Sequence, residues 1–589
     1  MRFLTIFMVS MKRLSESRPL EDPISREKDQ IYPPLIDDIN QWPINKLTEN
    51  RSAFVKKLEA YSFNTISRKS TDFIKDLIQK TIFQEKTRIK EEPWRIDPPN
   101  DRVFWNRIRK KMADSDIDSS HQKEENVNES LKLIIHRYAE EIVGTFNTKT
   151  YRLIRKILTI LFKRLLNKGI KVAPSNKVDK VLLDKLKIYG PIEKIRMLSS
   201  KGTVVTLPTH SSNLDSVLIG YTMDYKLGLT GSAYGAGLNL YNFGPAAYFM
   251  NRLGAYRVDR RKKSVIYLTT LAGMSKLAIQ AGTLSLFFPG GTRSRSGGLE
   301  DKLKLGLLNS VIEAQRSIYE EGRNDKVYVV PLVLSYHFVL EAKNLIEDFL
   351  KKTGKERYVK SRNEFTSFRS WTKFLYQFIS KSTTISLSFG EPMDCFGNFL
   401  NDEGESVDPR GKVIDTRDYF MYEGKLTSNH QRESEYTKNL GNIVAERYKA
   451  ENIILSSHLV SYVAFQLLKA ANPNLDLYSL LSLPEDEFFF SREQFLEQSG
   501  IVVEMLKGKA LERLLKLPEI FDRDILTLVL DGIDQIGTFH SSRPITIHKN
   551  GDFYSQDFRL LYFYNNRLES YGYESEIAWN NLPVVYQID

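Results

Sequence analysis

The sequence predicts an α/β fold in which a central, largely parallel sheet is flanked by helices. A helical N-terminal region precedes this sheet and an α+β C-terminal region follows it. Between residues 176 and 400, short runs rich in β-branched and aromatic residues alternate with stretches of helical length. The segments before this part are charged and helix-patterned, and those after it are mainly helical. Alternating strands and helices favour a parallel sheet, because the crossover helices cover its faces.

Composition limits the classes of protein to which the chain belongs. Its 589 residues are too many for one hydrophobic core, and 41% hydrophobic with 27% charged residues is typical of a folded protein. The single cysteine, Cys395, excludes a disulfide framework and a cysteine-based zinc site. No run reaches the roughly 18–20 apolar residues of a membrane span, and the apolar run after Arg2 is short for a signal peptide. We therefore expect a cytoplasmic protein.

Residues 1–175 form the predicted helical N-terminal region. From Leu131 to Ile142, apolar residues recur along one stripe at helical spacing. The stretch TYRLIRKILTILFKRLLNK (150–168) predicts a basic amphipathic helix. Such a helix either lies on an anionic membrane or packs against its own protein, and the sequence leaves both open.

Four apolar runs in the predicted central domain, residues 176–400, are expected to be strands. These are residues 202–208, 283–288, 326–336 and 383–390, and helices are expected around 264–281 and 303–321. Their β-branched and aromatic content and their short length favour strands over buried helices.

Two further regions complete the predicted organisation. Residues 401–440 are rich in acids, Gly and Asn, and we expect a polar linker or excursion there. Residues 441–589 are predicted to be helical and to end in a β-hairpin. The hairpin is expected because 545–566 has the pattern of two strands around an Asn550-Gly551 turn.

A polar segment follows the first predicted strand. In VTLPTHSSNLDSVLIG (205–220), His210 lies in the expected loop and Asp215 at the start of the next helix. Ligands of open α/β sheets bind at this edge. Five residues do not place both side chains on one helix face, so they meet only across the loop–helix junction, with Ser211 or Ser212 as the helix cap. Asp215 would then fix the imidazole and leave Nε2 to take a proton; in the alternative interpretation it only caps the helix.

A glycine- and arginine-rich segment follows the second predicted strand. LSLFFPGGTRSRSGG (284–298) contains Gly290, Gly291, Thr292, Arg293, Ser294 and Arg295. Glycines let a backbone approach a ligand and present amides to an anion. In an extended loop, residues 293 and 295 share one side, where two guanidiniums suit a phosphate. The Gly-Lys-Ser/Thr ending of a P-loop is absent, so we predict another kind of anion site.

Positive charge is concentrated around this segment. Residues 251–310 carry eleven Lys and Arg side chains against three acidic ones, in a chain with a net charge of +12. A localised positive field favours an anionic ligand or an anionic surface. A basic face exposed to solvent is the other interpretation.

Four sequence blocks, in order, resemble the glycerolipid acyltransferase superfamily. HSSNLD (210–215) resembles its H-x4-D signature. Residues 237–261 are similar to its second block, and Arg260 matches the arginine at the end of that block. FPGGTRSRSG (288–297) is similar to the third block, and VVPLVLSY (329–336), with Pro331, to the fourth. The chain is most similar to bacterial glycerol-3-phosphate acyltransferases.

The resemblance implies transfer of a fatty acyl group from acyl-CoA or acyl-carrier protein to the 1-hydroxyl of glycerol 3-phosphate. This is the first step of phospholipid synthesis, and it places the protein peripherally on the inner face of the cell membrane. It implies that His210 is the general base and that Asp215 orients it. The implied substrate-binding residues are Arg260, Gly290, Gly291, Thr292, Arg293, Ser294, Arg295 and Pro331, with the arginines on the phosphate and the two glycine amides on the oxyanion. Because a thiolate leaves readily, we expect no metal and no cofactor beyond the acyl donor.

Two positions depart from the family pattern. The third block usually carries a glutamate where this chain has Gly290, and glycerol-3-phosphate enzymes often have arginine where this chain has Ser211. Two alternatives therefore remain open: an acyltransferase acting on lysophosphatidate or another lysophospholipid, and a non-catalytic lipid-binding relative. Nucleic acid is not an expected partner, because the chain has no recognisable nucleic-acid-binding module.

Overall fold

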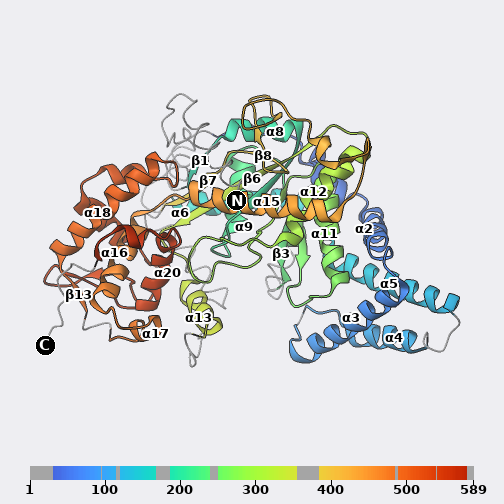
Figure 1. The fold of residues 1–589 in the computed structure, drawn as a ribbon, viewed down its shortest axis with the longest axis horizontal. Coiled ribbons are helices and arrows are strands. Elements are labelled where there is room, and N and C mark those ends of the chain that lie inside the picture. The colour runs from blue at the N-terminus through green and yellow to red at the C-terminus, as the bar shows by residue number, and fades with distance from the viewer. Residues whose placement is uncertain are drawn as a thin grey trace.

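The structure is a computed structural model that describes residues 31–94, 96–114, 120–166, 186–238, 250–354, 384–484, 488–538 and 540–579. Three parts follow one another along the long axis (Figure 1). The N-terminal helices between residues 51 and 142 gather at one end, the central sheet and its helices lie in the middle, and C-terminal helices form the other end. The predicted boundary near residue 175 lies outside the described residues.

The central sheet is mixed but mostly parallel. Its strands are β1 (Leu186–Tyr189), β2 (Gly202–Pro208), β3 (Ala233–Gly237), β4 (Ala255–Val258), β5 (Ser285–Leu286), β6 (Lys326–Tyr336), β7 (Ile385–Phe389), β8 (Met393–Asp394), β9 (Phe399–Leu400) and β10 (Ser406–Val407). The order is β10-β9-β8-β6-β2-β5-β3-β4, and β7 pairs with β6 and β1. Strands β6, β2, β5, β3 and β4 run parallel, whereas β7 and β8 pair with β6 in the antiparallel sense. The predicted α/β class is therefore confirmed.

Helices cover both faces of this sheet. They are α8 (Ile192–Lys201), α9 (Asp215–Tyr221), α11 (Val265–Gln280), α12 (Leu305–Glu320), α13 (Ala342–Lys352) and α15 (His430–Glu451). Successive residues of β2 point to opposite faces: Val204 joins the core that continues into the C-terminal helices, and Val205 joins a second core beneath α12 and α15. The predicted helices at 264–281 and 303–321 are confirmed as α11 and α12.

The N-terminal part is helical, as expected. Its helices are α2 (Arg51–Ile66), α3 (Thr71–Glu91), α4 (Asp101–Asp114), α5 (Ser120–Ile142) and α6 (Thr148–Leu166), after short turns η1 (Ile39–Gln41) and η2 (Pro43–Leu47). The predicted stripe from Leu131 to Ile142 lies on α5 and is fully buried. Helices α2 and α5 pack against α11, which joins this part to the central sheet (Figure 1).

The C-terminal part surrounds α16. Its elements are α16 (Ser456–Ala471), α17 (Leu477–Leu480), β13 (Phe489–Phe490), α18 (Arg492–Leu511), η6 (Glu519–Asp522), α19 (Ile525–Gln535), β14 (Thr546–Ile547), β15 (Phe553–Tyr554), α20 (Phe558–Glu569) and η7 (Tyr573–Glu576). The Asn550-Gly551 hairpin exists as β14 and β15, but the prediction of strands up to residue 566 is wrong. Asp557 accepts hydrogen bonds from the backbone N–H groups of Arg559 and Leu560 and starts α20 instead. This cap outweighs the aromatic, strand-like composition.

Residues 401–440, predicted to be a polar linker or excursion, contain short regular elements. Strand β10 adds to the central sheet, and η5 (Thr416–Phe420), β11 (Met421–Tyr422), β12 (Lys425–Leu426) and the start of α15 follow. The polar residues serve turns and caps: Asp408 accepts from the N–H groups of Arg410 and Lys412, and Asn429 caps α15. Side-chain bonds of this kind order a segment that has few apolar residues.

Across the described part of the chain, no helix is both long and apolar enough to cross a membrane.

Candidate active site

His210 and Asp215 meet at the carboxyl end of β2. The histidine lies in the loop after Pro208, and Asp215 begins α9, so the predicted loop–helix junction is confirmed. His210 Nδ1 lies 2.8 Å from Asp215 Oδ2. Asp215 is completely buried, whereas 12% of the His210 side chain remains accessible. Because Nδ1 is engaged by the carboxylate, Nε2 is the ring nitrogen left for a ligand.

The Asp215 carboxylate receives further hydrogen bonds that fix its position. Oδ2 accepts from the backbone N–H groups of Ser211 at 2.7 Å and Ser212 at 2.9 Å. Oδ1 accepts from the Tyr336 hydroxyl at 2.5 Å. Burial, with the Asp215 charge next in effect, raises the pKa of Tyr336 well above its ordinary value, so that this hydroxyl stays a donor. The prediction that a serine side chain caps α9 is wrong, because the serine N–H groups turn back to Asp215 and no side chain caps the helix.

A second loop encloses His210. We call residues 289–298, which follow β5, the glycine–arginine loop. The N–H of Ser294 donates to the His210 carbonyl at 2.7 Å. The imidazole stacks on Phe288, with ring centroids 4.1 Å apart and planes inclined by 24°. The N–H of His210 donates to Glu300 Oε1 at 3.1 Å. Backbone and ring are therefore both held in place.

Two arginines, Arg260 and Arg293, lie beside the histidine, and the charge of a third, Arg295, acts on Arg260. Arg260, which follows β4, and Arg293 line the same pocket as His210, a space of about 510 Å³ that also borders β3. Arg260 remains open to solvent, yet partial burial, followed by the charges of Arg293 and Arg295, lowers its pKa. Among the described residues no carboxylate forms an ion pair with Arg260, whereas Arg293 pairs with Glu341 at 3.1 Å. Within the described part of the chain, Arg260 is therefore the pocket arginine whose charge has no carboxylate partner.

Glu341 connects the two loops. Besides Arg293, it accepts hydrogen bonds from the Ser212 hydroxyl at 3.0 Å and the Asn213 N–H at 3.1 Å. The histidine loop and the glycine–arginine loop are thus fixed relative to each other. Sequence reasoning missed Glu341, Tyr336 and Glu300, because each lies at least 90 residues from the histidine-loop residue that it contacts and forms no local motif.

Several predicted binding residues have structural roles in this arrangement. Gly291 has a φ of +74°, and its N–H already donates to the Phe288 carbonyl at 2.9 Å, so that amide is not open to an oxyanion. The Ser294 hydroxyl donates to the Gly298 carbonyl at 2.7 Å. Thr292 lies in the same loop and is partly exposed.

Pro331, which the resemblance implies as a substrate-binding residue, lies inside a strand and not in a loop. It lies inside β6, fully flanked by β2 on one side. On the other side β6 changes partner around it, from β8 at Tyr328 and Val329 to β7 from Leu332 onward. Proline has no backbone N–H to donate to a neighbouring strand. At the point where β6 changes from one partner to the other, no such donor is needed. Pro331 is absent from the residues that line the pocket.

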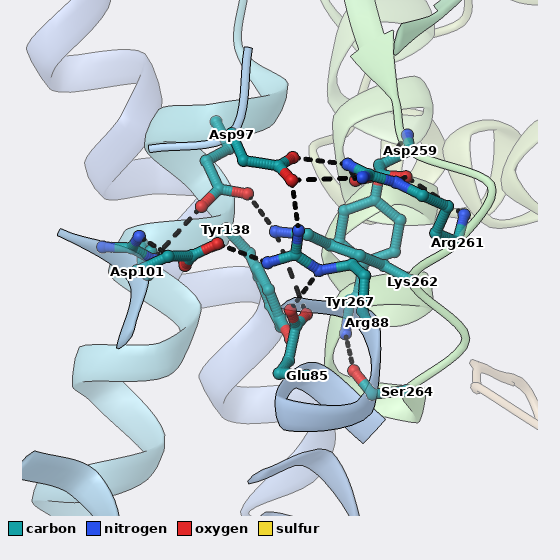
Figure 2. Close-up of polar contacts among 12 residues, drawn as sticks. Glu85, Arg88, Asp97, Asp101, Tyr138, Asp259, Arg261, Lys262, Ser264 and Tyr267 are labelled. Carbon is teal, nitrogen blue, oxygen red and sulfur yellow. Dashed lines mark hydrogen bonds and ion pairs between the residues drawn. The ribbon is translucent and has the colours of Figure 1, made fainter. Parts of the chain in front are cut away.

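The N-terminal part forms ion pairs with the chain on one side of Arg260. Figure 2 shows a buried charge network in which Arg88 binds Glu85 at 2.7 Å and Asp97 at 3.1 Å. Asp97 in turn binds Arg261 at 2.5 Å. Leaving one member of such a network unpaired costs roughly 3–5 kcal/mol, so the network strongly favours a single geometry.

Asp259 and Lys262, which lie next to Arg260 and Arg261 in the chain, are also held by ion pairs and hydrogen bonds. Asp259 binds Arg261 at 2.8 Å and donates its N–H to the Tyr267 hydroxyl at 2.7 Å. Lys262 forms an ion pair with Glu141 of α5 (Figure 2 shows Lys262 within the same network). Part of the predicted basic cluster thus serves to fix this loop, which leaves Arg260 to face the pocket.

The comparisons with known proteins agree with this geometry. Residues 191–335 match the family model described as Acyltransferase. The chain is 25% identical over 268 residues to a glycerol-3-phosphate acyltransferase of Alteromonas mediterranea, covering 45% of this chain and 28% of that protein. It is 27% identical over 291 residues to the glycerol-3-phosphate acyltransferase of Hamiltonella defensa, covering 48% of this chain and 31% of the relative. The matched part thus spans less than a third of the length of these curated relatives.

One solved structure covers 51% of this chain and 98% of its own, at 14% identity and a TM-score of 0.23: the 1-acyl-sn-glycerophosphate acyltransferase PlsC from Thermotoga maritima. The family match contains both the His210–Asp215 pair and the glycine–arginine loop. Residues 191–335 therefore form a domain that matches the acyltransferase family.

Proposed function

We propose that this protein is an O-acyltransferase that moves a fatty acyl group from acyl-CoA or acyl-carrier protein to the 1-hydroxyl of glycerol 3-phosphate. One observation carries the proposal: the His210–Asp215 pair borders the same pocket as Arg260 and Arg293. A base and a phosphate-binding cluster in one pocket match an acceptor that has both a hydroxyl and a phosphate. The names of the curated relatives support this choice of acceptor.

In the proposed reaction, His210 and the two substrates account for every proton and bond that changes. His210 Nε2 takes the proton from the acceptor hydroxyl as its oxygen attacks the thioester carbonyl. The C–S bond then breaks, an ester forms, and the departing thiolate receives the proton from the imidazolium. Asp215 stabilises the imidazolium through Nδ1–H. The step requires neither a metal nor a further cofactor.

The arginines would bind the acceptor's phosphate. Arg260 has no described carboxylate partner, and its pKa is lowered partly because Arg293 and Arg295 repel its charge. A phosphate dianion relieves this repulsion and accepts bidentate hydrogen bonds from guanidinium groups. The proposed acceptor is therefore oriented with its phosphate on the arginines and its hydroxyl at Nε2.

A panel of acceptors tests the proposal. With labelled acyl-CoA, wild-type protein is expected to acylate glycerol 3-phosphate and to leave glycerol, which lacks the phosphate, essentially unreacted. Transfer confined to 1-acylglycerol 3-phosphate would instead identify a lysophospholipid acyltransferase. Absence of transfer to every acceptor, with either donor, would favour the non-catalytic lipid-binding alternative.

We further propose that α6 binds the anionic inner face of the cell membrane. Leu153 and Ile157 are 51% and 44% exposed on this helix, beside the exposed Arg152 and Lys156. Apolar residues next to basic ones match an anionic lipid surface. The helix is anchored to the protein by Tyr151, whose hydroxyl donates to Asp224 at 2.9 Å.

Vesicle co-sedimentation tests this membrane contact. The double variant Leu153→Glu/Ile157→Glu is expected to weaken binding to anionic vesicles about tenfold or more, because two apolar contacts are lost and two like charges are added. The control is Phe83→Glu on α3, where the phenylalanine is 72% exposed. Equal binding by both variants would exclude α6 as the contact.

A further inference from the structure

Glu300 occupies the space beside Gly290. A Cβ atom added at Gly290 would lie 2.9 Å from Glu300 Oε1 and 3.1 Å from its Cγ. The same Oε1 accepts the hydrogen bond from the His210 N–H at 3.1 Å. The carboxylate thus fills room that a side chain at position 290 would need, and from there it holds the backbone of the proposed base.

Two residues of one segment, Ser294 and Glu300, form hydrogen bonds with the backbone N–H and carbonyl groups of His210. Glu300 accepts from its N–H, and the Ser294 N–H donates to its carbonyl at 2.7 Å. The ring itself is set by Asp215 and by stacking on Phe288. Loss of the Glu300 contact therefore releases one of the two backbone anchors of the histidine while its ring contacts remain available.

The Glu300 carboxylate is costly for folding at neutral pH. Burial raises its pKa to about 7, only partly opposed by the His210 N–H and Arg567. No described lysine or arginine forms an ion pair with it. The folded protein therefore binds a proton between about pH 4.5 and 7 where the unfolded chain has lost it, and stability falls as pH rises through this window. A carboxylate kept at such a cost points to a role in activity.

We propose that Glu300 is a positioning residue for His210, and that glycine is required at position 290 to leave room for its carboxylate. Glu300 then supplies, from ten residues further along the chain, an acid at the place where the family pattern has one at position 290. Only the kinetic test of this inference depends on the proposed function.

The variant Glu300→Ala, which removes the acceptor of the His210 N–H, tests the positioning role. It is expected to lower kcat for acyl transfer about 10- to 100-fold with the KM for glycerol 3-phosphate nearly unchanged, because the base is misplaced while the arginines are intact. Glu300→Gln keeps an acceptor oxygen and should restore most of kcat. At pH 8 the thermal midpoint of Glu300→Gln should exceed that of wild type, and at pH 5 the difference should shrink. The matched control, Asp301→Asn, removes the neighbouring exposed charge and should change neither property. A wild-type kcat in Glu300→Ala would overturn the proposal.

A double-mutant cycle tests the role of Gly290. Its φ is not in the left-handed region, so alanine is compatible with its backbone. Gly290→Ala is expected to lower kcat in the wild-type background, where the new Cβ meets Glu300, and to have little further effect in a Glu300→Ala background. Equal losses in both backgrounds would show that the two positions do not interact and would contradict the proposal.

Amide hydrogen exchange distinguishes this inference from the proposed function. Exchange in the peptide that contains His210 should be faster in Glu300→Ala than in wild type, and unchanged in Asp301→Asn. This measurement needs no reaction. Inactive wild-type protein with the expected exchange would refute the proposed function alone, and active protein with unchanged exchange and kcat in Glu300→Ala would refute the role of Glu300 alone.

Discussion

His210→Ala is expected to lower kcat for acyl transfer to glycerol 3-phosphate by about 10²- to 10⁴-fold, the usual contribution of a positioned general base. Among the described residues that line this pocket, the imidazole is the only group that combines a fixed tautomer, set by Asp215 at 2.8 Å, with a second nitrogen left for the substrate. Alanine removes the base but leaves the arginines in place. Initial rates with labelled acyl-CoA measure the effect.

The control for this variant is His430→Ala. His430 is exposed at the start of α15, and its loss should leave kcat unchanged. Circular dichroism and the thermal midpoint should show that His210→Ala is folded, because the imidazole is replaced without breaking a backbone hydrogen bond. Activity of folded His210→Ala equal to that of wild type would rule out the proposed base.

Arg260→Met is expected to act on acceptor binding. Loss of a charge-assisted hydrogen bond to phosphate costs about 1.5–3 kcal/mol, which corresponds to an increase of roughly 10- to 100-fold in the KM for glycerol 3-phosphate. The KM for the acyl donor should change little. Arg260→Lys should give an intermediate KM, because an ammonium keeps the charge but loses the bidentate geometry.

Lys263→Met is the matched control for the arginine. It removes one positive charge from an exposed residue three positions further along the chain. If the arginine acts only through the general positive field, both variants should raise the KM equally, and the effect should vanish at high salt. A selective increase for Arg260→Met is what a phosphate contact predicts.

The features that the sequence predicts correctly are those encoded by short-range patterns. Strands β2 and β6 are continuous apolar runs, and α5 carries an apolar stripe at helical spacing. The meeting of His210 and Asp215 follows from a strand, a loop and a helix start within eight residues, which together allow a single local geometry. Arg293 is far from His210 along the chain and reaches the site because it follows β5, which lies beside β2.

Long-range contacts explain what the sequence does not predict. Tyr336 contacts Asp215, which lies 121 residues away in the sequence, and Glu341 contacts Ser212, which lies 129 residues away. The local sequence around these residues does not indicate either hydrogen bond. The role of Glu300 beside Gly290 appears only once the loop has folded back on itself. The position of Pro331 also depends on distant elements: the change of strand partner that tolerates it involves β7 and β8, more than 50 residues away.

Calorimetric titration of glycerol 3-phosphate into folded His210→Ala protein tests the central claim most directly, because it separates the phosphate cluster from the base. The account predicts that this variant binds glycerol 3-phosphate with a Kd close to the wild-type value, binds glycerol far more weakly, and transfers acyl groups about 10²- to 10⁴-fold more slowly than wild type. Equal affinity for glycerol and glycerol 3-phosphate, or undiminished acyl transfer by the same sample, would contradict it.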